Sequence, residues 1–159
     1  MRSQSILHFA LWLSLGGWVG SWAFFLFVVS RIAFQVLPDD IAGDLSSSLL
    51  SVLHFGGAGA ALVVAAAAAA LGRRGRLVGL PIGLALICLA SEFWLSPEVA
   101  AVRPSTLGAA STEQTAHRFE VLHGLLLGLF IGVHLASIGL VWLYARLDPR
   151  DHSWRADDP

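Results

Sequence analysis

Four ionisable side chains lie inside strongly apolar stretches of this 159-residue chain: His54, Glu92, His123 and His134. Apolar surroundings tolerate such groups poorly, so each needs a partner or a role. Imidazoles bind haem iron or metal ions and take up protons near neutral pH. The residue types therefore favour haem or metal ligation, proton transfer, or structural hydrogen bonding.

The positions of His54 and His123 suggest one shared site. His54 follows the start of its apolar segment by about five residues, or roughly 8 Å of helix, and His123 by about four residues, or roughly 6 Å. Two imidazoles at matched depth on different helices are what a bis-histidine haem b site or a small copper site requires. Hydrogen bonding of both rings to backbone or serine is the structural alternative.

Further candidates lie on the last apolar segment. His134 follows His123 by eleven residues, a rotation of only about 20° on an ideal helix, so the two share a face. A second, inner site would use His134 and His8. Glu120 and His123 form a Glu-x-x-His pair, which adds Glu120 as a third metal ligand beside His54 and His123. Di-iron bundles need that pair twice, and this sequence has it once, so a di-iron site is excluded.

The elements that must position these side chains are membrane spans. The chain is 56% hydrophobic and 13% charged, with a mean hydropathy of +0.71. A span needs about 20 apolar residues, and four segments provide them: 6–29, 49–71, 77–95 and 119–144. We predict an all-α, integral membrane four-helix bundle over residues 1–145, followed by a polar cytoplasmic tail over 146–159.

Arginine positions predict the orientation. The densest basic cluster, Gly72–Arg76, lies between the second and third segments, and the connection 37–48 has three Asp and no Arg. The positive-inside rule then places both termini and the 72–76 loop in the cytoplasm, with the protein in the cell inner (plasma) membrane. The bilayer is the expected environment, and a net charge of −1 gives no reason to expect nucleic acid.

Local signals predict where the helices end. Pro38 disfavours helix at Leu37, which stops the first span. Ser46–Ser48 are a plausible N-cap for the second, and the connection 96–116, rich in Pro, Ser, Thr, Ala and Gly, is predicted to be irregular.

Small residues recur at every fourth position of the last segment: Gly124, Gly128, Gly132 and Ala136. This spacing predicts that the segment packs at the centre of the bundle. Arg31 near the end of the first span is expected either to pair with Glu92 or Glu120 or to extend towards the headgroups.

Two stretches resemble a known family. They are Leu15-Gly16-Gly17-Trp18-Val19-Gly20, continuing through Phe34 and Leu37-Pro38, and Phe119-Glu120-Val121-Leu122-His123-Gly124. Together they resemble the transmembrane protein 205-like family of four-span membrane proteins, whose last helix opens with Phe-x-x-Leu-His-Gly. The resemblance implies a fold and a membrane location more than an activity. Leu7-His8, Trp12 and Gly16-Gly17 are more loosely similar to copper-resistance D-type proteins and haem-containing protoporphyrinogen oxidases.

Four functions fit these features. The first is a small accessory or scaffold subunit of an inner-membrane assembly, without catalysis of its own, contacting other membrane subunits or further copies of itself. The second is a haem b or copper protein with ligands His54 and His123. The third is a haem-dependent oxidase using His8 and His134. The fourth is a small ion or metal transporter in which Glu92, Glu120 and His123 relay protons or metal ions.

Overall fold

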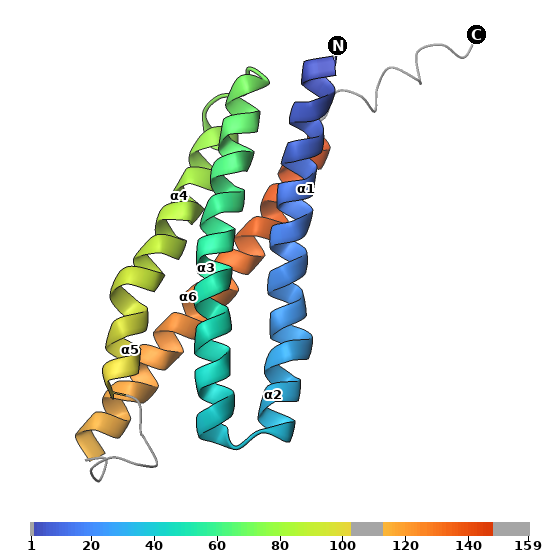
Figure 1. Ribbon diagram of the computed structural model, residues 1–159. Coiled ribbons are helices and arrows are strands. Elements are labelled where there is room, and N and C mark those ends of the chain that lie inside the picture. The colour runs from blue at the N-terminus through green and yellow to red at the C-terminus, as the bar shows by residue number, and fades with distance from the viewer. Residues whose placement is uncertain (1, 103–112, 148–159) are drawn as a thin grey trace.

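The described part of the chain folds into a bundle of four helical rods (Figure 1). The structure, a computed structural model, describes residues 2–102 and 113–147, and this part of the chain contains no strand. The elements are α1 (Arg2–Phe24), the π-helix η1 (Phe25–Val29), α2 (Ser30–Val36), α3 (Asp39–Ala70), α4 (Arg76–Ala90), the π-helix η2 (Ser91–Leu95), α5 (Ser96–Val102) and α6 (Glu113–Arg146).

Each rod is long and apolar enough to cross a membrane. The first joins α1, η1 and α2, and the third joins α4, η2 and α5. Large apolar side chains cover the outside of the rods; Trp94, for example, is 76% exposed. Such a surface suits hydrocarbon better than water. The prediction of an all-α membrane bundle is confirmed.

The first span ends where proline predicts. Helix continues to Val36, and Leu37 is extended, with φ −114° and ψ 152°, before Pro38. The prediction that Ser46–Ser48 cap the second span is wrong, because α3 already begins at Asp39. Asp39 and Asp40 lie in its first turn, where carboxylates stabilise the positive end of the helix dipole. The serines therefore lie within the helix.

The connection 96–116 is also more helical than predicted. Ser96–Val102 form α5 and continue the third rod, and α6 begins at Glu113. Ser96 N–H donates to Ser91 O at the end of η2, so the third rod continues from the π-helix through Pro97. Residues 103–112, and the predicted polar tail from residue 148 onwards, lie outside the described residues.

The turn between α3 and α4 depends on two glycines. Gly72 and Gly75 have φ of 76° and 61°, a region that favours glycine. The N–H of Arg73 donates to Ala68 O (3.0 Å) and that of Gly72 to Ala69 O (2.9 Å), which is the Schellman pattern. The chain reverses here within a few residues, so α3 and α4 run antiparallel.

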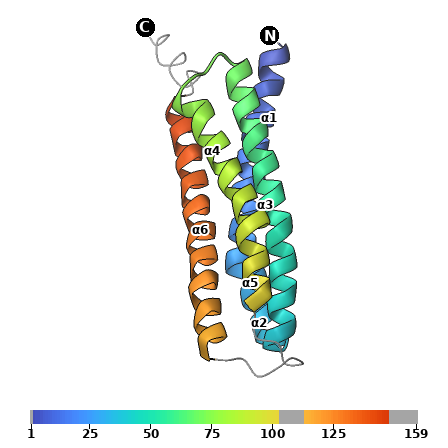
Figure 2. The ribbon, with the colours of Figure 1, turned by 90° about the vertical axis from the view of Figure 1, so that its left-hand side faces the viewer.

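The rods arrange the chain ends in a simple way. The beginning of α1, the α3–α4 turn and the end of α6 all lie at one end of the bundle (Figures 1 and 2). The α2–α3 turn, the end of α5 and the start of α6 lie at the other. Four antiparallel spans with both termini on one side require these chain ends and turns to be grouped in this way.

The small-residue stripe of α6 does not face the centre of the bundle. Gly124, Gly128 and Gly132 are exposed, and a Cβ at any of them would meet nothing within 4 Å. The prediction of central packing is therefore wrong. The buried face of α6 instead carries larger side chains: Leu126, Phe130, Val133, His134, Ser137, Leu140 and Tyr144.

Candidate functional site

Glu92 is the centre of a polar cluster between two rods. Its Oε1 accepts a hydrogen bond from Ser51 Oγ at 2.6 Å, and its Oε2 lies 3.0 Å from His54 Nδ1. Ser51 and His54 are three residues apart on α3, so they present the same face to Glu92. The side chain of His54 is 2% exposed and that of Glu92 15% exposed. The rods thus hold a hydrogen-bonded carboxylate–imidazole pair within their membrane-spanning length.

A local irregularity accompanies Glu92. It lies in η2, whose wider turn interrupts the regular α-helix of the third rod. Ser91 is buried here, whereas Phe93 and Trp94 are 63% and 76% exposed. Single π-turns of this kind occur frequently at functional sites.

The order of the bonds limits the chemistry of the cluster. The carboxylate stands between the hydroxyl and the imidazole, so Ser51 donates to Glu92 and not to His54. A nucleophilic serine requires the imidazole between hydroxyl and carboxylate. The proton of the Glu92–His54 bond can be carried by the carboxyl oxygen or by Nδ1, because the donor depends on the tautomer of His54. The arrangement suits proton uptake and cation binding better than acyl transfer.

Trp22 connects this cluster to the rest of the bundle. Its indole N–H donates to Leu53 O at 3.3 Å, and its ring lies edge-on to His54, with centroids 6.1 Å apart. On α6, Phe130 stacks on Trp22 at 4.4 Å, and His134 lies 6.5 Å from it in near-parallel orientation. Trp22 is 1% exposed, so three helices hold the His54 ring in place.

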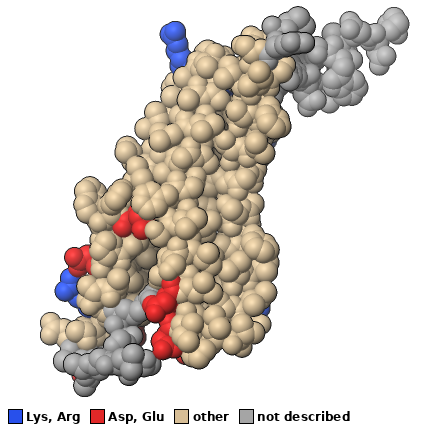
Figure 3. All heavy atoms as spheres, viewed as in Figure 1, with Lys and Arg blue, Asp and Glu red and all other residues tan. Residues whose placement is uncertain are grey.

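A pocket of about 530 Å³ opens beside Glu92. We call it the serine pocket; its lining is Ser47, Ser48, Leu50, Ser51, Glu92, Ser96, Pro97, Val99, Ala100 and Leu126. It lies among α3, η2, α5 and α6, towards the end of the bundle that carries the α2–α3 turn. On the face drawn in Figure 3, the acidic side chains also gather in that half of the molecule.

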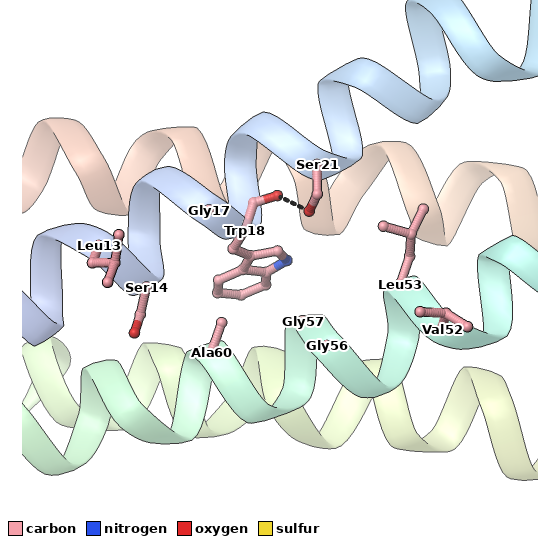
Figure 4. A pocket seen from close by; sticks show the side chains of 10 residues that line it. All are labelled: Leu13, Ser14, Gly17, Trp18, Ser21, Val52, Leu53, Gly56, Gly57 and Ala60. Carbon is pink, nitrogen blue, oxygen red and sulfur yellow. Dashed lines mark hydrogen bonds between the residues drawn. The ribbon is translucent and has the colours of Figure 1, made fainter.

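A second pocket, of about 320 Å³, lies between α1 and α3 around Trp18 (Figure 4). The Trp18 indole nitrogen has no hydrogen-bond partner among the described residues, and a Cβ on Gly57 would stand 2.9 Å from it. Ser21 Oγ donates to Trp18 O at 3.0 Å. No ionisable side chain is among the described residues that line this pocket.

His54 and His123, which the sequence predicts to share one site, contact different residues. His123 is exposed and stacks on Phe119 of its own helix at 5.4 Å, whereas His54 is bonded to Glu92. Glu120 is exposed as well. Within residues 2–102 and 113–147, no hydrogen bond or ring contact joins His54 to His123, and no three metal-binding side chains gather.

His8 and His134, the second predicted pair, also share no hydrogen bond or ring contact in the described segments. His8 Nδ1 lies 2.8 Å from Gln4 O near the start of α1. His134 is 5% exposed, and its Nδ1 has no partner among the described residues. The assignments of haem, copper or other metal to these four histidines stay predictions.

Two features of the site were not predicted from the sequence: the partners of Glu92 and the role of Trp22. Arg31, one expected partner of Glu92, is exposed, and Glu92 instead bonds to Ser51 and His54. The i, i+3 spacing of Ser51 and His54 was the available signal. Trp22 was visible only as an apolar side chain, because its role depends on three helices meeting.

The fold and the cluster define a class: a multi-pass helical membrane protein with a polar pair inside the bundle. More particularly, the chain belongs to the family described as Domain of unknown function (DUF4149), whose model matches residues 13–106. Trp22, Ser51, His54 and Glu92 all lie in the matched segment. Comparisons with curated proteins and with solved structures found no match.

Proposed function

We propose that this protein is a small ion transporter that moves protons through the His54–Glu92 pair. The observation that carries the proposal is the hydrogen-bonded pair itself, with Nδ1 and Oε2 3.0 Å apart inside a membrane-spanning bundle. Ionisable groups at such positions are costly, and they commonly mark proton or ion pathways.

The charge of the pair supports proton binding. With Glu92 ionised and His54 protonated the pair is neutral, and loss of one proton leaves a single negative charge in apolar surroundings. That charge favours recapture of a proton or capture of a cation. The hydrogen bond from Ser51 stabilises the ionised carboxylate between these events.

The position of the serine pocket beside the pair supports proton exchange through it. Glu92 lines the serine pocket, while His54 lies behind it at 2% exposure. A proton entering from the pocket would reach the carboxylate first and the imidazole second.

The proposal is tested in liposomes that contain the purified protein and a pH-sensitive dye. A pH step across the membrane should dissipate about tenfold faster with the natural sequence than with Glu92→Gln, because the amide cannot carry the proton. Glu113→Gln is the matched control, since Glu113 is exposed at the start of α6 and belongs to none of the predicted sites. Equal rates for all three proteins and for empty liposomes would refute proton transport.

A second candidate function, a subunit of a larger membrane assembly, is favoured by the outward-facing stripe on α6. Gly124, Gly128 and Gly132 leave a smooth exposed surface, on which another helix can approach closely. The partner would be a further copy of this chain or another membrane subunit. Gly128→Leu should then abolish co-purification or oligomers while the monomer stays folded; unchanged assembly would contradict this candidate.

We also propose a relationship to the transmembrane protein 205-like proteins. Its support is the glycine-aromatic first span with Leu37-Pro38 at its end, and the Phe-x-x-Leu-His-Gly sequence at Phe119–Gly124. The proposed location is the cell inner membrane with both termini in the cytoplasm. The arginine-rich 72–76 loop supports it, since it shares one end of the bundle with the start of α1 and the end of α6.

A further inference from the structure

We infer that the serine pocket binds a monovalent alkali cation, such as Na⁺, which replaces the proton of the His54–Glu92 pair. The inference rests on the proposed function and adds the coupled ion. The pocket combines a mostly buried carboxylate, that of Glu92, with several hydroxyl groups.

The donor atoms favour a hard cation. The polar side chains in the lining are Glu92 and the serines Ser47, Ser48, Ser51 and Ser96, so every polar side-chain atom is oxygen. Oxygen ligands suit alkali and alkaline-earth ions, whereas copper and zinc prefer nitrogen and sulfur. Ser51 Oγ already lies 2.6 Å from Glu92 Oε1, so two oxygens are held together.

The charge of the pocket favours a monovalent ion. Glu92 is the one charged side chain among the described lining residues. One carboxylate neutralises one positive charge, and a divalent ion would leave a net charge in apolar surroundings.

The composition of the pocket argues against a quaternary ammonium cation. Its volume of about 530 Å³ admits an ion with part of its hydration shell, since each water occupies about 30 Å³. None of the described lining residues is aromatic, so the pocket lacks the cage that quaternary ammonium groups use.

The exchange conserves charge. In the proton-bound state one proton is shared between Glu92 Oε2 and His54 Nδ1. When the cation arrives at Glu92, this shared proton leaves through the pocket, and the imidazole keeps its proton on Nε2 and is neutral. One positive charge leaves for each that enters, so the pair together with its bound proton or cation has no net charge in either state.

The side chains around the His54–Glu92 pair take no part in this exchange of a proton for a cation. On α1 the neighbour of His54 is Trp22. The His134 ring of α6 lies against Trp22. The residue of α6 that lines the pocket is Leu126, which carries no charge. Glu98 of α5 is engaged by Arg118 of α6 at 2.8 Å, and both are more than half exposed. Asp44 of α3 is exposed one turn beyond Ser48.

The test measures proton release from the full-length protein in nanodiscs, in weakly buffered choline chloride. NaCl should release about one proton per chain, with a half-saturating concentration that rises as pH falls. An equal addition of choline chloride should release none. Glu92→Gln should abolish the release, whereas Glu113→Gln should retain it.

A milder pair of variants keeps the test valid if Glu92→Gln fails to fold. Ser96→Ala removes a lining hydroxyl and should raise the half-saturating NaCl about threefold to tenfold. Ser30→Ala, outside the pocket, should leave it unchanged. Two results would overturn the alkali-cation site: proton release by MgCl₂ but not by NaCl, or no proton release by either salt. If proton flux in liposomes still depended on Glu92, the proposed transport would stand in both cases. Release by NaCl without liposome flux would support the site and refute the transport.

Discussion

At the scale of single residues, the protein is unusual in burying His54 against a carboxylate. His54 is packed against Trp22 and bonded to Glu92, so its ring is held in position. His123, on an outer face, has only Phe119 beside its ring. The two histidines that the sequence treats as equivalent therefore have different surroundings.

Replacing His54 should destabilise the bundle, and replacing His123 should not. His54→Ala removes a hydrogen bond to Glu92 and leaves a cavity beside Trp22, so we expect a loss of about 2 kcal/mol in the free energy of unfolding. His123→Ala should stay within about 0.5 kcal/mol, as exposed substitutions usually do. Equilibrium unfolding in mixed micelles measures both. Equal losses for the two variants would contradict the described environments. An absorption spectrum of the same samples tests the haem prediction, because a Soret band lost in either variant would identify that histidine as a ligand.

At the scale of elements, close approach of α1 and α3 positions the site. Gly57 is buried on α3, and the Trp18 ring of α1 lies against it. The same face of α1 presents Trp22 to His54 one turn further along. A change in the spacing of these two helices would therefore move the ring that covers the site.

A methyl group at Gly57 should separate the two helices. The new Cβ would stand 2.9 Å from Trp18 Nε1 and 3.2 Å from Trp22 Cζ2, and both rings are buried. We expect Gly57→Ala to lower stability by about 1–3 kcal/mol. Gly56→Ala is the matched control, because a Cβ there meets nothing within 4 Å. Thermal unfolding followed by tryptophan fluorescence measures both, and a neutral Gly57→Ala would show that the helices can shift without loss.

At the scale of the whole molecule, the four rods place the two kinds of connection at opposite ends. The basic 72–76 loop shares an end with the start of α1 and the end of α6, and the acidic α2–α3 turn lies at the other. The serine pocket is nearer the acidic end. If the termini are cytoplasmic, the pocket lies in the half of the bundle towards the outside.

Cysteine labelling in intact cells tests this orientation. The natural Cys88 is 1% exposed and should not react, so single introduced cysteines can be followed. A membrane-impermeant maleimide should label Asp39→Cys in intact cells, and Ser3→Cys and Arg74→Cys only after permeabilisation. Labelling of Ser3→Cys in intact cells would reverse the topology and place the pocket on the cytoplasmic side.

Sequence alone determined the architecture. Apolar segments of about 20 residues have few stable alternatives to helix in a bilayer, because every backbone group must be bonded internally. Pro38 fixed the end of the first span for an equally local reason. Predicted helix ends failed at 37–48 and 96–116, where polar residues continue the helices beyond the apolar segments.

Only the tertiary structure decided which faces meet. The glycine spacing on α6 suggested a central stripe, yet Leu126, Phe130 and Val133 face the bundle instead, since larger side chains fill its interior. His54 could have paired with a histidine, a serine or an acid; packing of η2 against α3 brings Glu92 to it. Rotation of a helix about its axis is set by contacts with its neighbours, and in an apolar sequence many rotations bury similar surface. The local sequence thus fixes where the helices are, while the pairing of polar groups follows from how they pack.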